Sequence, residues 1–358
     1  MVIAVLLKSF LVTIIYFILS ASYIHAERDS FGAYRNLAPS SSPLLPQTLK
    51  HYTAAQKLIQ NKLTKKLSRK EASILRALDW LIGFADKDEN FDFVSTNFFL
   101  LLYEMTASRG RIHQKEVAQL ILETSFARAQ KRLSQIYPPE KDTKESFIGL
   151  LQILLDYPQF QAPYYKYYTR AFSFKDEKFN FQKAQSSNDY RQMYEHLVSA
   201  SFLYYYLLKD KATTLALPEN SFLEDLKKLE KFEYKTSYPV PSYEFVQLGY
   251  LATHVVLVLT NYGQFAISPS TNARKAARYI QATFDKVRDK LGYLDLYAEY
   301  IQCLKILNIA PSARINKLED FLFDLQRPDG SWGTEQTFKS DPYTAFHPTW
   351  AVITALNQ

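Results

Sequence analysis

Glycine is scarce in this chain, with nine in 358 residues, well below the usual ~7%. Because hairpin turns and β-bulges often require glycine, a barrel or sandwich of many short strands is disfavoured. The single cysteine, Cys303, excludes an intramolecular disulfide and any zinc or iron–sulfur site that needs several cysteines. These two scarcities favour a helical protein that has no disulfide bonds.

Charged residues are also few, at 22% of the chain, while hydrophobic residues make up 47% and aromatic residues 15%. A chain of this composition can bury a large core, so disorder and coiled coils are excluded. The formal net charge of +7 is small for 358 residues, and the basic residues are dispersed. Nucleic acid is therefore not an expected partner.

Long apolar runs are absent except in the first 26 residues. Lys8 is followed by an apolar run over residues 10–19, and small residues up to Ala26 offer cleavage positions. This pattern predicts a secretory signal peptide over residues 1–26; an uncleaved membrane anchor or a buried helix are the alternatives. No disulfide can form and no Asn-x-Ser/Thr sequon occurs, so a secreted or periplasmic bacterial protein is favoured. Membrane contact is expected only through an uncleaved segment.

Residues 27–47 contain three prolines and predict an extended linker, and residues 48–358 predict one domain. In this domain apolar residues recur at three- and four-residue spacing, which is typical of helices. A capping box, Ser68 to Glu71, opens one helix that ends near Asp86. The other predicted helices cover approximately 48–66, 94–107, 112–135, 144–156, 161–172, 188–208, 221–232, 242–261, 270–290, 293–308, 312–326 and 348–357. Paired helices of this number predict an open solenoid or a closed ring of hairpins.

The segment Gln326-Arg-Pro-Asp-Gly330-Ser-Trp332 resembles the Q-x-x-x-G-x-W element of the squalene–hopene cyclase and prenyltransferase superfamily. The resemblance covers the last 40 residues or so, because the segment from Asp341 to Trp350 also resembles the start of an inner helix in those proteins. It implies an α/α toroid of about six helical hairpins around a central cavity, in which the glutamine and the tryptophan tie one helix end to the next.

The same residues have a physical interpretation that does not depend on the family. Asp329-Gly330 is a turn pair in which glycine takes a positive φ, and Trp332 is expected to pack back against the preceding helix end. Pro348 is expected at the first position of the last helix, with His347 as its cap.

The functional motifs of the superfamily are missing. There is no Asp-x-Asp-Asp acid motif, and the acidic group from Asp86 to Asp92 has another spacing in what we expect to be a surface loop. The diphosphate–magnesium cluster is absent, and Cys303 has no aspartate two residues before it. Hydrolase, metalloprotease and nucleotide-binding motifs are absent as well. The sequence therefore predicts no cofactor and no metal.

Polar residues inside apolar helices are the candidates for chemistry. His254 lies in an apolar helix, with Tyr250 and Asn261 along the same side. It is either a core histidine with one hydrogen bond or a functional histidine that lines a cavity. Asp295 and Glu299 lie one helical turn apart; if their face is buried, one carboxyl should have a raised pKa, and if it faces solvent the pair has no function.

A third candidate group comprises Asp341, Tyr343 and His347, followed by Trp350, near the start of the last helix. In a toroid these residues would lie at the rim of the cavity, although capping explains His347 equally well.

The preferred hypothesis is an exported toroid enzyme that performs acid–base chemistry on a glycan or another small molecule. The expected catalytic residues are His254, Glu299, Asp341 and His347, and the expected substrate-lining residues are Tyr250, Asn261, Asp295, Tyr343 and Trp350. One alternative is a non-catalytic helical scaffold that binds a protein, a lipid or a polyisoprenoid. The other is a divergent terpenoid cyclase-like protein that lacks the acid motif.

Overall fold

The computed structural model describes residues 51–107, 112–133, 153, 157, 179–209, 222–265, 271–288, 293–333 and 343–358. In these residues there are twelve α-helices and no β-strand, which confirms the all-helical class. The helices are α2 (Thr53–Leu63), α3 (Arg69–Ala85), α4 (Asp88–Ala107), α5 (Ile112–Leu133), α8 (Phe181–Ser186), α9 (Tyr190–Lys209), α10 (Phe222–Leu229), α11 (Tyr243–Leu259), α12 (Thr271–Arg288), α13 (Leu294–Ile306), α14 (Ser312–Asp324) and α16 (Tyr343–Asn357). The predicted signal peptide, the linker and the predicted helix at 161–172 lie outside the described residues, and of the predicted helix at 144–156 only Ile153 is described.

Helix starts follow the capping rules read from the sequence. Ser68 caps α3, where its Oγ accepts the Glu71 amide at 3.3 Å and the Glu71 carboxylate accepts the Ser68 amide at 3.0 Å. This reciprocal pair confirms the predicted capping box. Ser242 caps α11 in a similar way, by accepting the Phe245 amide at 3.2 Å.

Two loop predictions were wrong. The acidic group from Asp86 to Asp92 is mostly helical, because α4 begins at Asp88. Arg128 from α5 holds this junction, since its guanidinium donates to the carbonyl oxygens of Ala85 and Asp86 and to the Asp88 carboxylate. No helix was predicted between residues 172 and 188, but the short helix α8 forms there under an Asn180 cap.

The last helix begins earlier than predicted. It starts at Tyr343, so Pro348 lies inside α16 and His347 is not its cap. Proline removes a backbone donor and would by itself favour a helix boundary. Tertiary contacts on both sides of Pro348 explain the continuation: Phe346 is fully buried, and Thr349 Oγ1 accepts the Trp332 amide at 2.9 Å.

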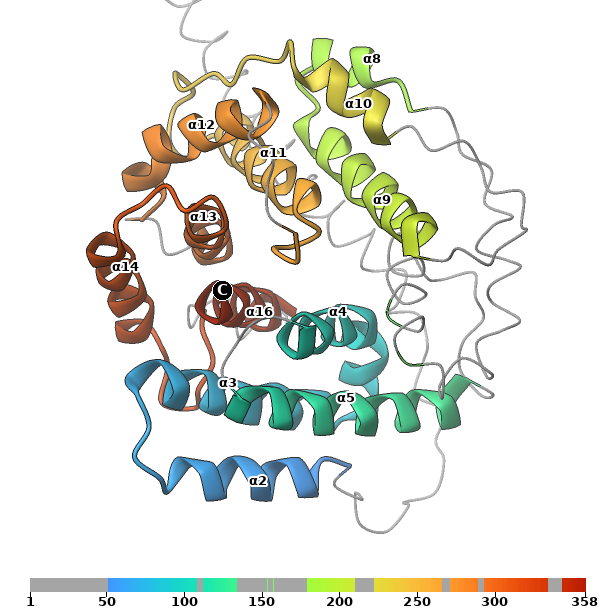
Figure 1. The fold of residues 1–358 in the computed structure, drawn as a ribbon, viewed down its shortest axis with the longest axis vertical. Coiled ribbons are helices and arrows are strands. Elements are labelled where there is room, and N and C mark those ends of the chain that lie inside the picture. The colour runs from blue at the N-terminus through green and yellow to red at the C-terminus, as the bar shows by residue number, and fades with distance from the viewer. Residues whose placement is uncertain are drawn as a thin grey trace, which may run out of the picture. The chain divides into compact units, whose positions relative to one another are not determined.

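The helices after α9 alternate between two layers. α9, α11, α13, α16 and α4 form a run of neighbours, in which α9 contacts α11, α11 contacts α13, α13 contacts α16 and α16 contacts α4. On one side of this run, α12 packs against α11 and α13, and α14 packs against α13 (Figure 1). Because α14 and α16 both contact α3, the C-terminal helices pack against the N-terminal ones.

Gln326 and Trp332 fix this C-terminal junction. Gln326 Nε2 donates to the carbonyl oxygens of Ser73 (2.8 Å) and Gly330 (2.9 Å), which ties the end of α14 to α3. Trp332 is fully buried, and its Nε1 donates to the Leu322 carbonyl at 2.7 Å, so it packs against the end of α14 as predicted. Gly330 has a φ of 92°, as its turn role requires, and a Cβ there would clash with the Arg76 carbonyl.

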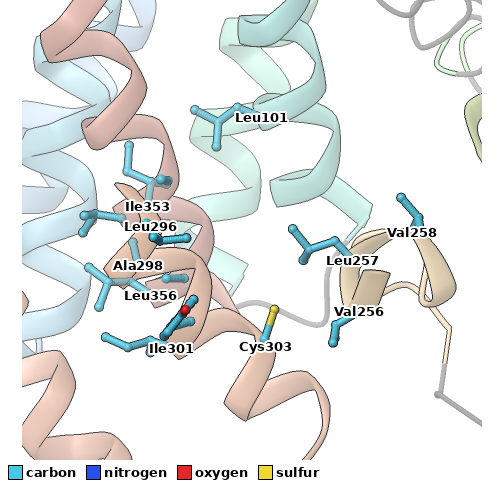
Figure 2. Close-up of a cluster of buried hydrophobic side chains, with 14 of the residues drawn as sticks. Leu101, Val256, Leu257, Val258, Leu296, Ala298, Ile301, Cys303, Ile353 and Leu356 are labelled. Carbon is cyan, nitrogen blue, oxygen red and sulfur yellow. The ribbon is translucent and has the colours of Figure 1, made fainter. Parts of the chain in front are cut away.

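Helices α11, α13 and α16 are apolar on the faces that form the core. Val256, Leu257 and Val258 of α11 and Leu296, Ala298 and Ile301 of α13 are buried, together with Ile353 and Leu356 of α16 (Figure 2). Gly249 allows α11 and α13 to approach each other, because a Cβ there would lie 3.0 Å from Leu296. None of the described helices combines the length and the apolar character needed to span a membrane.

Candidate functional site

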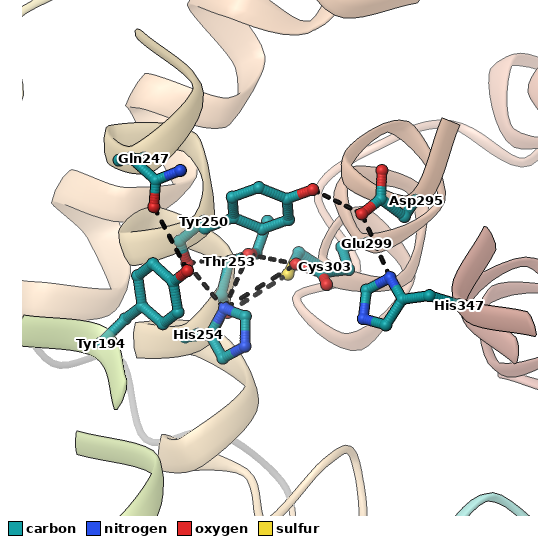
Figure 3. Close-up of polar contacts among 9 residues, drawn as sticks. All are labelled: Tyr194, Gln247, Tyr250, Thr253, His254, Asp295, Glu299, Cys303 and His347. Carbon is teal, nitrogen blue, oxygen red and sulfur yellow. Dashed lines mark hydrogen bonds and ion pairs between the residues drawn. The ribbon is translucent and has the colours of Figure 1, made fainter. Parts of the chain in front are cut away.

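Polar side chains from four helices meet beside the aliphatic core. Figure 3 shows them: Tyr194 and Gln247 at one edge, Tyr250, Thr253 and His254 on α11, Asp295, Glu299 and Cys303 on α13, and His347 on α16. Two ionisable pairs join three of the helices. His254 Nδ1 lies 3.8 Å from Glu299 Oε2, and His347 Nδ1 lies 3.2 Å from Asp295 Oδ2.

Asp295 and His347 form an ion pair. The Asp295 carboxylate also accepts the Tyr250 hydroxyl at 2.5 Å. Burial alone would raise the pKa of Asp295, but the hydrogen bond and the charge of His347 outweigh burial and lower it. Burial alone would lower the pKa of His347, but Asp295 outweighs burial and raises it. The pairing therefore favours the charged form of both groups.

Glu299 has the opposite protonation state. Burial, with a smaller contribution from the Asp295 charge, raises its pKa from 4.5 to about 8, although the hydrogen bond from Thr253 lowers it. Thr253 Oγ1 donates to Glu299 Oε2 at 2.6 Å. Glu299 is therefore protonated at neutral pH, one helical turn from an ionised Asp295. A raised pKa at one of the two carboxyls is what the sequence predicted for a buried face.

His254 is held as a neutral ring in one tautomer. Its Nδ1 donates to the Tyr250 carbonyl at 2.8 Å, because a carbonyl oxygen can only accept. Burial lowers the pKa of His254 to about 4, and the backbone hydrogen bond opposes this shift. Tyr194 stacks on the ring with centroids 4.8 Å apart. The Nε2 atom consequently carries the lone pair, and no hydrogen bond from the described residues reaches it.

The four ionisable side chains remain partly accessible. The exposed fractions of the side chains are 28% for His347, 17% for His254, 15% for Asp295 and 11% for Glu299. They are thus buried enough for strong electrostatic coupling, and each retains some contact with solvent.

The structure brings together five of the nine predicted site residues, namely Tyr250, His254, Asp295, Glu299 and His347. Trp350 is adjacent, since its ring meets the His347 ring edge to face at 5.2 Å. Asn261 is not brought to the group: α11 ends at Leu259, and Asn261 lies in the following turn with a φ of 45°. Its amide donates to Gln264 Oε1 at 2.8 Å.

Asp341 lies outside the described residues, and Tyr343 is the first residue of α16, where its side chain is not described.

Sequence analysis missed Thr253 and Tyr194. Thr253 precedes His254, and on a helix consecutive residues point in different directions, so no pattern linked it to Glu299. Tyr194 lies on α9, about 60 residues before His254, and only the packing of α9 on α11 brings it there. The Cys303 thiol is fully buried near the Thr253 carbonyl, and burial, with a contribution from Glu299, raises its pKa. A buried thiol whose pKa is raised is poorly suited to act as a nucleophile.

Comparison with known proteins gives no relative: no family model, no curated protein and no solved structure matches this chain. Within the described part of the chain, no three His, Cys, Asp or Glu side chains are grouped in a way that could bind a metal ion. The chemistry of the site has to be inferred from its own geometry.

Proposed function

We propose that this chain is an exported α/α-toroid enzyme that performs acid–base chemistry on a glycan or another small molecule. The alternation of inner and outer helices from α11 to α16, and the packing of α14 and α16 against α3, support a ring of helical hairpins. The apolar N-terminal segment supports export. The acid–base cluster would face the inside of this ring.

One observation carries the proposal: two carboxyls on one face of α13 lie against two histidines from neighbouring helices, and their surroundings shift the two carboxyl pKa values in opposite directions. Such divergence marks the acid and the ionised partner in many enzymes. Glu299 is the proton donor. Its Oε2 lies 2.6 Å from the Thr253 hydroxyl, which is also 3.0 Å from the Tyr250 carbonyl, and no described residue hydrogen-bonds Oε1, so Oε1 remains for a substrate.

His254 is the proton acceptor, and it acts through Nε2. Its ring is oriented by the Tyr250 carbonyl at Nδ1 and by the stacked Tyr194 ring. The acid and the base are close to each other, as the 3.8 Å separation of His254 Nδ1 and Glu299 Oε2 shows. The ion pair of Asp295 and His347 supplies fixed charge beside them, which stabilises charge that develops in a transition state.

The experiment is a turnover screen on the purified protein, using a panel of oligosaccharides with product detection by mass spectrometry. Glu299→Gln keeps the shape but removes the acidic proton, and we expect it to lower kcat at least about 100-fold. Glu233→Gln, which changes a carboxyl that is 79% exposed, is the matched control and should keep wild-type turnover.

Full activity of the Glu299 variant would refute the proposal, and so would the absence of turnover on every member of the panel. Absence of turnover combined with binding of a protein or a lipid would favour the non-catalytic scaffold instead. The terpenoid cyclase-like alternative predicts that a linear isoprenoid is turned over and that substitution of the acidic residues at 86, 88 and 92 abolishes this activity.

A further inference from the structure

Gln302 is a buried polar residue that the acid–base proposal does not use. It lies on α13, three residues after Glu299 and seven after Asp295, so all three occupy one helix face. Only 3% of Gln302 is exposed, and its Nε2 has no hydrogen-bond acceptor among the described residues. A buried amide donor without a partner is costly in a folded protein and requires an explanation.

Trp350 presents a second donor of this kind. It lies on α16, three residues after His347, and the two rings are in contact at 5.2 Å. Its Nε1 is shielded from solvent and lacks an acceptor among the described residues. Two helices that flank the ion pair of Asp295 and His347 thus each carry an unpaired donor.

The unsatisfied hydrogen-bonding groups of the cluster define the chemistry of a ligand. The Nε2 amide of Gln302 and the Nε1 indole of Trp350 are donors, and the Nε2 of His254 is the one acceptor in this set. A complementary ligand has several acceptor oxygens and at least one hydroxyl that can donate.

The charges of the cluster further restrict the ligand. Asp295 and His347 neutralise each other at 3.2 Å, and His254 makes its hydrogen bonds as a neutral ring. An anionic ligand would meet the Asp295 carboxylate, and a cationic one would meet the His347 imidazolium. An uncharged ligand avoids both repulsions.

We propose that this site binds an uncharged, polyhydroxylated ligand of the neutral sugar class, whose oxygens accept from Gln302 and Trp350 and whose hydroxyl donates to His254. This inference rests on the proposed function, because it concerns the same site. A polyisoprenoid offers no acceptor and would leave every donor unpaired. A carboxylate offers acceptors but no donor for His254 Nε2, and a phosphate brings a negative charge beside the Asp295 carboxylate.

The test measures binding by calorimetry and thermal shift. The probes are neutral oligosaccharides of glucose, galactose, mannose, xylose and N-acetylglucosamine, with oligogalacturonate and a farnesol-loaded vesicle as charged and apolar comparisons. Gln302→Leu removes one donor and nearly keeps the shape, and Trp350→Phe removes the other donor together with one ring. We expect each variant to weaken sugar binding about fivefold or more. Gln302→Leu should not lower the melting temperature, since it removes an unpaired buried donor.

The inference is overturned if no neutral sugar binds the wild type, if the two variants bind as tightly as the wild type, or if the uronate or farnesol probe binds more tightly than every neutral sugar. It also fails if Gln302→Leu melts at a lower temperature than the wild type, because the amide is then structural. Glu299→Gln separates this inference from the proposed function. If the wild type binds a sugar but does not turn it over, the enzyme proposal alone is refuted. If the wild type turns over a charged or hydrocarbon substrate and Glu299→Gln does not, the sugar proposal alone is refuted.

Discussion

Glu299 should reduce the stability of the folded protein at neutral pH, and glutamine in its place should relieve this. In the unfolded chain the carboxyl ionises near its ordinary pKa of 4.5, whereas burial keeps it protonated in the folded protein up to about pH 8. Below pH 4.5 both states are protonated, so the residue has no effect on stability. As the pH rises from 4.5 to 8, the unfolded state gains a favourable ionisation that the folded state cannot match.

The magnitude follows from the size of this pH interval. Each pKa unit corresponds to about 1.4 kcal/mol, so the cost of Glu299 at pH 7 is on the order of 3 kcal/mol. Its side chain is only 11% exposed, so solvent screening removes little of this effect. Glutamine cannot ionise and retains an oxygen to accept from Thr253. We therefore expect Glu299→Gln to raise the free energy of unfolding by a few kcal/mol at pH 7 and to leave it unchanged at pH 4.

The assay is urea unfolding of both proteins at pH 4 and pH 7, followed by circular dichroism. Glu319→Gln is the control, with the opposite expected sign. Burial would raise the pKa of Glu319, but Lys305 and Lys70, bound at 2.8 and 3.0 Å, outweigh burial and lower it. Its ionised form stabilises the folded state above the ordinary pKa, and this stability is lost as the pH falls through the lowered pKa. This variant should therefore be less stable than the wild type at pH 7.

A Glu299→Gln variant that is destabilised at pH 7, or that shows the same shift at pH 4 and pH 7, would contradict the assigned protonation state. The proposed acid role would then lose its basis.

Other predictions concern the pH profile, the ion pair and the C-terminal turn. If His254 is the base and Glu299 the acid, kcat/KM should fall below about pH 4 and above about pH 8, and a profile without the alkaline limb would exclude Glu299 as the acid. Asp295→Asn should lower the pKa of His347, measured by NMR titration of its ring protons; an unchanged value would show that the two do not interact. Gly330→Ala should destabilise the fold by about 1–3 kcal/mol, because alanine at positive φ is strained and its Cβ would clash with a carbonyl of α3. A melting temperature equal to that of the wild type would refute this prediction.

Local structure was largely predictable from the sequence. Three- and four-residue spacing located most of the described helices, and the capping box at Ser68 and the turn at Gly330 were identified by residue type alone. The prediction failed where tertiary contacts override local preference. The start of α16 lies before Pro348 because Phe346 and Thr349 pack against the rest of the protein.

The candidate site was predictable only in part, for a related reason. Helical periodicity placed Asp295 and Glu299 on one face, and an imidazole within an apolar helix marked His254. Whether that face is buried, and which of the two carboxyls keeps its proton, depends on groups from other helices. His347 approaches Asp295 across about 50 residues of chain, and Thr253 approaches Glu299 from α11.

The sequence by itself determined the helical class, the helix caps and the residue types available for chemistry, because these depend on neighbours within a few positions along the chain. Only the tertiary structure decided the protonation states. Burial acts on each ionisable group through everything that is packed around it. His347 hydrogen-bonds Asp295 and outweighs burial there, whereas its charge has only a small effect on Glu299.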